Sequence, residues 1–358
     1  MAEIDALFEQ VLLRGGSDLH LAVGHPPTTR LQGRLHALRE GPLGEPEVQR
    51  MLDELLDDGQ RRRFADRRDL AFAHAYGYKA RFRVHCLVSA TGPGAVFRTI
   101  PSQVPSVEQL GLPEAAVALA ERRSGLVLIA GPSGSGKSTT LAALISHINH
   151  ARDGHVLTIE DPLEFVHTPI RCQVTHREVG AHVPGYLEAL ASAAREDADV
   201  IMVGALRDAS AMRAALELAS DGVLVLAGMC ARSAPATLER FVGAFGADEQ
   251  PAIRGALADV LAGVVAQQLV RTADGTGRVA AHEVLVGTRA VAEAIRTANA
   301  GALLELLGGG RRGMQRMDGA LRVLVEAGIA DPRDALARAL DRPAFAAIPA
   351  VRAAIDDG

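Results

Sequence analysis

One segment combines glycine, lysine and serine at the spacing that phosphate binding requires. Residues 131–138 read GPSGSGKS, which matches the pattern G-x-x-x-x-G-K-[ST]. Its glycines let backbone N–H groups turn toward phosphate oxygens, and a helix beginning near Lys137 would direct its positive dipole end to the same point. Lys137 would then reach the β- and γ-phosphates of ATP, and Ser138 would be a ligand of Mg²⁺. The chain has two lysines, and one of them stands where this motif demands lysine.

The neighbouring segments predict the strand and helix that such a loop needs. GLVLIAG (125–131) reads as a buried strand, and residues 139–149 place apolar side chains on one face of a helix. This context distinguishes the motif from a chance glycine-rich turn. The predicted nucleotide-binding residues are Gly131, Pro132, Ser133, Gly134, Ser135, Gly136, Lys137, Ser138 and Thr139.

Acidic residues follow a second predicted strand. HVLTI (155–159) runs directly into Glu160 and Asp161, and Glu164 lies just beyond. Carboxylates at strand ends near a phosphate-binding loop hold Mg²⁺ or orient the attacking water. These three residues are therefore candidate catalytic groups, with a solvated acidic turn as the alternative.

Two further strands end without such a group. DVIMVG (199–204) is followed by Ala205, which can neither accept a proton nor polarise water. VLVLAGM (223–229) is followed by Cys230, which we expect to be a small buried apolar residue because free cysteine most often takes that role.

The order of predicted elements indicates an α/β architecture. Between residues 125 and 229, helices alternate with strands that are nearly continuous apolar runs, which is typical of a parallel sheet covered on both faces. Residues 1–100 read as a small domain of mixed strands and helices, and the Pro-rich segment 101–115 reads as a linker. From residue 250 onward we expect mainly helix, interrupted by a hairpin-like segment at 271–285.

Composition limits the class of protein. The 358 residues are 48% hydrophobic and 23% charged, which excludes general disorder. The net charge of −5 disfavours a broad nucleic-acid-binding surface. Three widely separated cysteines fit a reducing compartment, and the apolar stretches are too short to span a membrane. No secretory signal is evident at the N-terminus. We therefore expect a soluble cytoplasmic protein with no nucleic-acid partner.

Taken together, the motifs resemble those of type IV pilus retraction (twitching motility) ATPases, the PilT-like branch of the secretion ATPase superfamily. The resemblance covers nearly the whole chain. Its motifs are GGSDLHL (15–21), ARFRV (80–84), GAVFRTIP (94–101), GLVLIAGPSGSGKSTTLAA (125–143), HVLTIEDPLEFVH (155–167), AREDADVIMVG (194–204), RVAAHEVLVGT (278–288) and GMQRMDGAL (313–321).

The resemblance implies an architecture and an assembly. It implies a PAS-like α+β N-terminal domain over 1–100, a linker over 101–115, a RecA-like ATPase domain over 116–300 and a helical C-terminal region over 301–358. It also implies a homohexameric ring that uses ATP and Mg²⁺ and acts on a platform protein of the pilus, at the cytoplasmic face of the inner membrane.

The resemblance also assigns roles to single residues. GPSGSGKST corresponds to the Walker A motif and TIEDPLEF to the aspartate box. Arg81, Arg83 and Arg98 match arginines of the N-terminal domain that approach the phosphates across the interface, a role suited to a planar guanidinium. The alternative for these three is a set of salt bridges along strand edges.

The chain departs from the family at several specific points. Ala205 stands where the family has a glutamate, the expected general base, and Cys230 stands at the position of the histidine box. AVAEAIRT (290–297) keeps only Ile295 and Arg296 of a helix motif tied to retraction, and the tetracysteine zinc motif of extension motors is absent from the sequence.

Three hypotheses follow from these departures. In the first hypothesis, the chain is an active retraction motor that uses Glu160 or Glu164 as its general base. Alternatively it is a nucleotide-binding, hydrolysis-poor paralogue that assembles with an active motor or regulates one. The third possibility is a non-catalytic interaction protein, which the intact Walker A motif disfavours.

Overall fold

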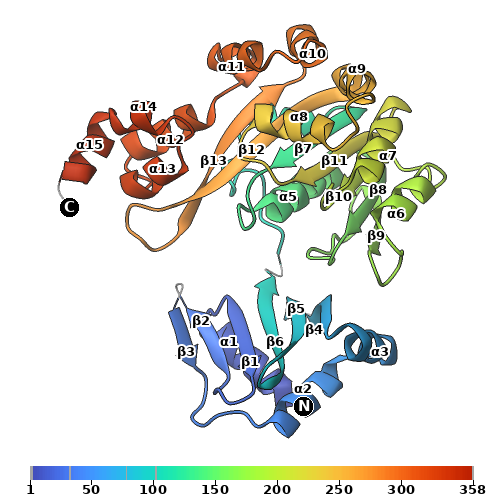
Figure 1. Cartoon of the computed structure of the whole chain (residues 1–358), viewed down its shortest axis with the longest axis vertical. Helices are drawn as coiled ribbons and strands as arrows, with labels where there is room; N and C mark the ends of the chain where they lie inside the picture. Colours follow the sequence, from blue (N-terminus) through green and yellow to red (C-terminus); the bar gives the residue numbers. More distant parts are fainter. Residues whose placement is uncertain (1–2, 32–33, 78, 101–102, 357–358) are drawn as a thin grey trace. The chain divides into compact units, whose positions relative to one another are not determined.

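The computed structural model describes residues 3–31, 34–77, 79–100 and 103–356, which form two compact units. The first unit consists of residues 1–103 together with Asp161–Val166. The second consists of residues 104–160 and 167–358. Each unit has its own β-sheet (Figure 1). The predicted boundaries at residues 101–115 and at 301 stay predictions, and the assignment of Asp161–Val166 to the first unit was not foreseen.

In its described residues, the first unit has a six-stranded antiparallel sheet and the helices α1, α2 and α3. The strand order is β3-β2-β1-β6-β5-β4. Phe8 stacks on Phe82, with ring centroids 4.2 Å apart, and meets the edge of Phe97. These rings form the centre of the core. The elements are α1 (Glu3–Leu13), β1 (Asp18–Ala22), β2 (Thr28–Leu31), β3 (Arg34–Ala37), α2 (Glu45–Leu55), α3 (Asp58–Arg67), β4 (Asp69–Tyr76), β5 (Ala80–Ser89) and β6 (Gly92–Ile100).

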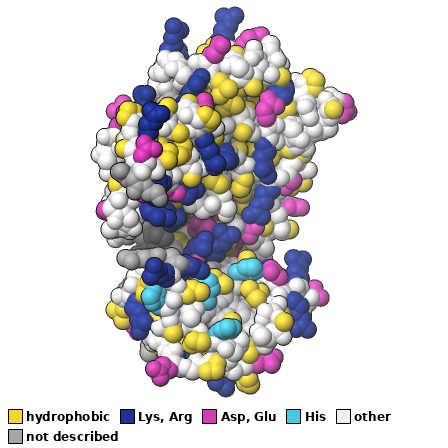
Figure 2. Space-filling model, turned by 60° about the vertical axis from the view of Figure 1, so that its left-hand side comes forward, with side chains coloured by type: hydrophobic (Ala, Val, Ile, Leu, Met, Phe, Trp, Pro, Cys, Tyr) yellow, Lys and Arg dark blue, Asp and Glu magenta, His cyan; other side chains and the backbone are white. Residues whose placement is uncertain are grey.

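Alternation along β5 separates the two faces of this sheet. Phe82 and Val84 are buried. Arg83, which lies between them, and His85, which follows Val84, are exposed. Successive side chains of a strand point to opposite faces, so one face packs on the helices and the other carries charge. Figure 2 shows arginine and histidine side chains on the surface of this unit.

The second unit is built on a seven-stranded sheet in the order β13-β12-β7-β11-β10-β8-β9. All neighbouring pairs from β12 to β9 are parallel, and β13 is antiparallel to β12. The strands are β7 (Gly125–Ala130), β8 (Gly154–Glu160), β9 (Cys172–Glu178), β10 (Val200–Val203), β11 (Leu224–Met229), β12 (Leu261–Arg271) and β13 (Arg278–Val286).

Helices pack against this sheet and bury its apolar strands. Every residue of β7, β10 and β11 is buried, as the continuous apolar runs predict. The helices are α4 (Glu114–Ala120), α5 (Lys137–Ala151), α6 (Tyr186–Ala193), α7 (Ala209–Ser220), α8 (Ala234–Gly243), α9 (Gln250–Val260), α10 (Arg289–Arg296) and α11 (Ala300–Gly308), followed by the short 3₁₀ helix η1 (Arg311–Gly313).

Two strands of the second unit were not predicted. The region after residue 250 is mainly helical around one hairpin, as expected, but β12 begins at Leu261, before the predicted hairpin-like segment at 271–285, and extends the sheet beyond β7. Strand β9 lies between the aspartate-box segment and α6, where no strand was predicted. Sequence periodicity alone cannot separate a buried strand from a buried helix segment, and β9 buries only Cys172.

The C-terminal helices form a small module on the far end of the β12–β13 hairpin (Figure 1). They are α12 (Met317–Glu326), α13 (Pro332–Arg338), α14 (Arg342–Ala346) and α15 (Pro349–Asp356). Their core joins Val270 and Ala281 of the hairpin to Met317, Leu321 and Phe345. Within the described residues, no helix is both long and apolar enough to cross a bilayer.

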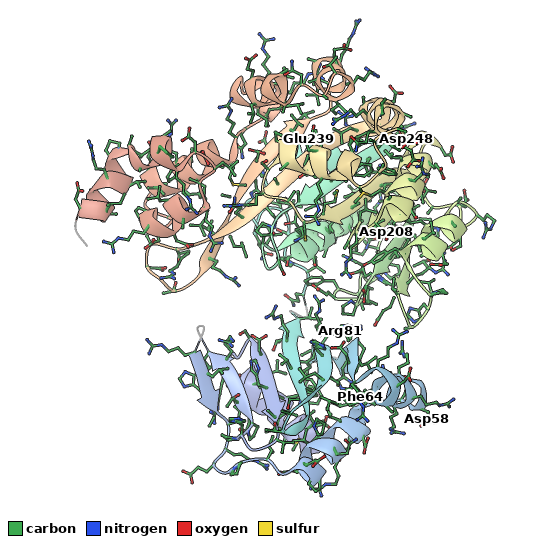
Figure 3. All side chains as sticks on the ribbon, viewed as in Figure 1. Asp58, Phe64, Arg81, Asp208, Glu239 and Asp248 are labelled. Atoms are coloured by element: carbon green, nitrogen blue, oxygen red, sulfur yellow. The ribbon has the colours of Figure 1, made fainter. Side chains whose placement is uncertain are left out.

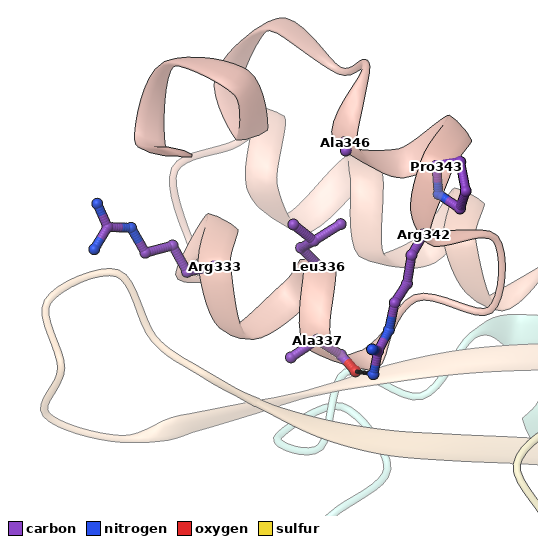
Figure 4. A pocket seen from close by; sticks show the side chains of 6 residues that line it. All are labelled: Arg333, Leu336, Ala337, Arg342, Pro343 and Ala346. Atoms are coloured by element: carbon purple, nitrogen blue, oxygen red, sulfur yellow. Dashed lines mark hydrogen bonds between the residues drawn. The ribbon is translucent and has the colours of Figure 1, made fainter. Parts of the chain in front are cut away.

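The same module carries an open hollow of about 390 Å³ on its surface (Figure 4). Leu336 and Pro343 are among its apolar lining residues, and Arg333 and Arg342 stand at its sides. Arg342 donates a hydrogen bond to the carbonyl of Ala337 (2.8 Å) and Arg333 to that of Ala354 (2.8 Å). None of the predicted nucleotide-binding residues lines this hollow.

Candidate nucleotide-binding site

The predicted phosphate loop lies between β7 and α5, the strand and the helix that the sequence predicts. Gly136 adopts a φ of +89°, a left-handed conformation that favours glycine, and α5 begins directly after it. Gly131 has no room for a side chain, because a Cβ there would lie 2.2 Å from Ser135 Oγ. The loop is therefore compact, with Ser135 buried beneath it and Ser133 and Gly134 exposed at its tip.

The side chain of Lys137 folds back onto the start of the phosphate loop. Its Nζ donates hydrogen bonds to the carbonyls of Gly131 (2.9 Å) and Pro132 (2.8 Å). Ser138 and Thr139 follow in the first turn of α5 and are half-buried. An ammonium, a helix N-terminus and a hydroxyl thus occur within three consecutive residues. This donor set fits a nucleotide phosphate, and the Ser138 hydroxyl fits a ligand of Mg²⁺.

A buried glutamine that sequence analysis missed lies beneath the loop. Gln267 of β12 has a side chain 2% exposed. Its Nε2 donates to the carbonyl of Ser135 (2.6 Å), and its Oε1 accepts from the hydroxyl of Thr140 in α5 (2.8 Å). An amide inside the apolar run GVVAQQLV (263–270) was the signal that could have revealed it, since buried polar groups need partners.

The three candidate carboxylates do not form one cluster within a single unit. Glu160 ends β8 in the second unit and is 5% exposed. Asp161 and Glu164 belong to the first unit. There Glu164 pairs with Arg83 of β5, with 3.2 Å between Oε1 and Nη1.

The residue that follows the end of β10 at the predicted base position is Ala205, which carries no carboxylate. Val203 is the last residue of the strand, and the half-buried Ala205 lies in the loop after it. The N–H of Gly204 donates to the carbonyl of Ile159 (2.8 Å), so this loop starts beside the end of β8. Asp208 instead caps α7, where its Oδ1 accepts from the N–H of Ala211 (2.9 Å; Figure 3).

Sheet order sets the distances along this edge. The strands run β7-β11-β10-β8, and neighbouring strands lie about 4.8 Å apart. The end of β10 is therefore two strand spacings, about 10 Å, from the strand that carries the phosphate loop. Glu160 on β8 is three spacings away, about 14 Å. If Glu160 were the base, it would lie one strand spacing further from the phosphate-loop strand than a base at position 205.

Cys230 differs from expectation. It was expected to be buried, but it is exposed in the loop after β11. The strand ends at Met229, so the next residue leaves the apolar layer.

The segment after Cys230 is anchored by a buried carboxylate from β13. Glu283 accepts hydrogen bonds from the N–H groups of Ala234 (2.5 Å) and Met317 (3.1 Å), which begin α8 and α12. Burial raises the pKa of Glu283, and the two N–H groups oppose that rise by stabilising its charge. One side chain thus joins the loop after β11 to the C-terminal module.

The structure places the three predicted arginines on the polar face of the first unit. Arg83 and Arg98 are directly opposite each other on β5 and β6, and Arg81 (Figure 3) lies two residues before Arg83 on the same face. Arg81 donates a long hydrogen bond to the carbonyl of Leu163 (3.5 Å). Arg98 donates to the buried Asp18 (2.9 Å), its register partner on β1. All three thus contact groups of their own unit.

Asp18 is held in its charged form by this contact. Burial acts to raise the pKa of Asp18, but hydrogen bonds from Ser17 and Arg98 bring it below the ordinary value. Arg30, opposite Asp18 on β2, adds a second positive charge at 4.0 Å. The carboxylate therefore orients arginines on both neighbouring strands.

The fold and the loop together define the class. A mainly parallel sheet with a phosphate loop after a central strand is the architecture of a RecA-like P-loop nucleoside triphosphatase, joined here to an α+β N-terminal unit. A family described as "Type II/IV secretion system protein" matches residues 3–316. The chain belongs to this family, and the predicted fold class is confirmed.

Within the family, the chain is similar to pilus retraction proteins. It is 41% identical to the type IV pilus retraction ATPase PilT of Pseudomonas aeruginosa over 91% of this chain and 95% of that protein. It is 40% identical to a twitching motility protein of Neisseria gonorrhoeae over 87% and 84%. A crystal structure of the pilus retraction motor PilT with bound ADP superposes with a TM-score of 0.88 at 32% identity, covering 96% and 99%. The predicted resemblance to the PilT-like branch is thereby confirmed.

Proposed function

We propose that this chain is an ATP-binding subunit of a type IV pilus retraction motor whose own ATP hydrolysis is slow. Similarity to PilT over nearly the full length of both chains supports the motor assignment. The observation that supports slow hydrolysis is Ala205, a residue without a proton acceptor that follows the end of β10, in a chain whose phosphate loop is intact. ATP with Mg²⁺ is the ligand, bound by residues 131–139.

The missing carboxylate affects rate and leaves affinity intact. A positioned general base contributes about 10²–10⁴ in rate, which corresponds to ~3–5 kcal/mol of barrier. Nucleotide affinity depends on other groups, namely Lys137, the loop amides and the N-terminus of α5. We therefore expect tight binding together with slow turnover.

Assembly into a ring completes the proposal. The subunit forms a hexamer with copies of itself or with a related active motor subunit, at the cytoplasmic face of the inner membrane beneath a pilus platform protein. Arg81, Arg83 and Arg98 are the residues we assign to the phosphates of a neighbouring subunit. Their location on one face of one sheet supports this role. In such an assembly they would exchange their present contacts for phosphate oxygens.

The test pairs equilibrium ATP binding with steady-state phosphate release, both with Mg²⁺ and purified full-length protein. Tight binding with release near background supports the proposal. Rapid release would mean that another group supplies the base, and the chain would then be a self-sufficient motor. If the protein does not bind ATP, the remaining interpretation is a non-catalytic interaction protein.

Glu160 is the residue to examine if release is rapid. It is buried at the end of β8, the next strand outward from β10. A Glu160→Gln variant keeps the shape of the side chain and removes the proton acceptor. Glu164→Gln serves as the matched comparison, because Glu164 pairs with Arg83 in the first unit. A loss of turnover in Glu160→Gln alone would identify the substitute base.

A further inference from the structure

Gln267 joins two parts of the phosphate-binding segment through one side-chain amide. β12 runs parallel to β7 with Ala266 opposite Ala130, so Gln267 lies beside the start of the loop at Gly131. From there its amide donates to the carbonyl of Ser135 and accepts from the hydroxyl of Thr140. The loop and the first turn of α5 are thus fixed to a strand that is distant in sequence.

The chemistry of the partners fixes the orientation of this amide. A backbone carbonyl can only accept, so the atom 2.6 Å from the Ser135 oxygen must be the nitrogen of Gln267. The other end of the amide is then an oxygen, which the Thr140 hydroxyl satisfies. The same nitrogen lies close to Gly136, since a Cβ added there would be 3.1 Å from it.

Anchoring the Ser135 carbonyl also orients the next N–H group. The peptide between Ser135 and Gly136 is planar and trans, so its C=O and N–H point in opposite directions. With the carbonyl directed at Gln267, the N–H of Gly136 points to the side of the loop away from β12. Gly136 immediately precedes Lys137 and α5, where the loop presents its positive groups.

We infer that Gln267 is a positioning residue of the nucleotide site, which sets the Ser135–Gly136 peptide so that the Gly136 N–H faces a nucleotide phosphate. The inference rests on the proposed binding of ATP and extends it to a residue outside the Walker motifs. Gln267 acts through the loop and makes no contact of its own with the nucleotide. Without its amide, the Ser135 carbonyl would be buried without its donor and the peptide would be free to rotate.

The adjacent residue provides a matched control. Gln268 is 1% exposed, and its Nε2 donates to the carbonyl of Arg338 in α13 (3.2 Å). It has the same side chain, the same strand and the same burial as Gln267, but it contacts the C-terminal module. Replacing either glutamine by methionine removes buried hydrogen bonding at nearly constant volume, so both variants should lose stability, Gln267→Met more because it loses two hydrogen bonds and Gln268→Met one.

The experiment measures the affinity of full-length protein for ADP with Mg²⁺ by calorimetry, alongside urea unfolding. We expect Gln267→Met to weaken ADP binding about ten-fold, and Gln268→Met to leave ADP binding unchanged although it is also destabilised. Equal ADP affinities in the wild type and in Gln267→Met would overturn the inference. Equal weakening in both variants would also overturn it, because it would reveal a general effect of destabilisation.

A second variant keeps the test decisive if Gln267→Met does not fold. Thr140→Val removes the hydroxyl that orients the amide and conserves the shape of the side chain. On its own, Thr140→Val should weaken ADP binding about three-fold relative to wild type. Added to Gln267→Met, it should cause no further loss of ADP affinity. Unchanged affinity in Thr140→Val would overturn the inference. If wild-type protein itself fails to bind ADP, the proposed function fails first, which separates the two outcomes.

Discussion

Replacing Ala205 by glutamate restores a carboxylate at the end of β10 and should raise ATP turnover. The loop there is anchored on both sides, by Gly204 to the carbonyl of Ile159 and by Leu206 to that of Gly228 (2.8 Å each). Ala205 itself is half-buried, so a longer side chain can extend from it toward the edge of the sheet. This edge is about 10 Å from the phosphate-loop strand, one spacing closer than Glu160.

The expected size of the effect follows from what a positioned base contributes. A full contribution is about 10²–10⁴ in rate. The new carboxylate lacks neighbours selected to orient it, so we set the lower bound for Ala205→Glu at about ten-fold, or ~1.4 kcal/mol of barrier. Affinity for ATP should stay within a few-fold of wild type, because the binding groups lie on a different strand.

The assay is steady-state phosphate release at saturating ATP and Mg²⁺, with ATP affinity measured in parallel. Ala205→Gln is the matched control, because its side chain has the same length but cannot accept the proton. Turnover should rise in Ala205→Glu and stay near wild type in Ala205→Gln. Flat turnover in Ala205→Glu, with nucleotide still bound, would refute the missing-base explanation. An equal rise in both variants would point to shape, with proton transfer excluded.

Three further predictions concern other parts of the chain. Lys137→Ala should abolish measurable ATP binding in calorimetry, and retained binding would contradict the phosphate-site assignment. Glu283→Gln should lower the free energy of unfolding, measured in urea, by about 1–3 kcal/mol, because the new amide NH₂ would face one of the two N–H donors that Glu283 now accepts from. An unchanged urea midpoint would contradict the role of Glu283 in anchoring α8 and α12. Asp18→Asn should be destabilising at pH 6. The folded-state pKa of Asp18 is lowered, so this deficit should shrink as pH falls below 3.8, and a pH-independent deficit would exclude the ion pair as its cause.

The strand, loop and helix of the phosphate site could be predicted because three local signals agree. A buried apolar run, a glycine-rich motif and an amphipathic helix occur in immediate succession, and the structure has β7 and α5 at those positions. The position of Ala205 at the edge of the sheet could also be predicted, because the ends of parallel strands meet at a common edge.

What could not be predicted depends on contacts between distant segments. The amide of Gln267 within an apolar run signals a buried polar partner, but Ser135 lies 132 residues away, so the local sequence does not identify the loop as that partner. Strand β9 buries too little surface to leave a period-two pattern. Cys230 was expected to follow its apolar strand into the core, but its exposure depends on where β11 ends.

The assignment of Asp161–Val166 to the first unit has a consequence for how such chains diversify by recombination. A crossover at residue 103 would transfer β5 but leave behind the six residues that supply Leu163 and Glu164 to Arg81 and Arg83. A chimaera built at that boundary would join β5 from one parent to an aspartate box from another. Compatible exchange therefore requires both segments to be inherited together, even though 57 residues of the second unit, from 104 to 160, separate them in sequence.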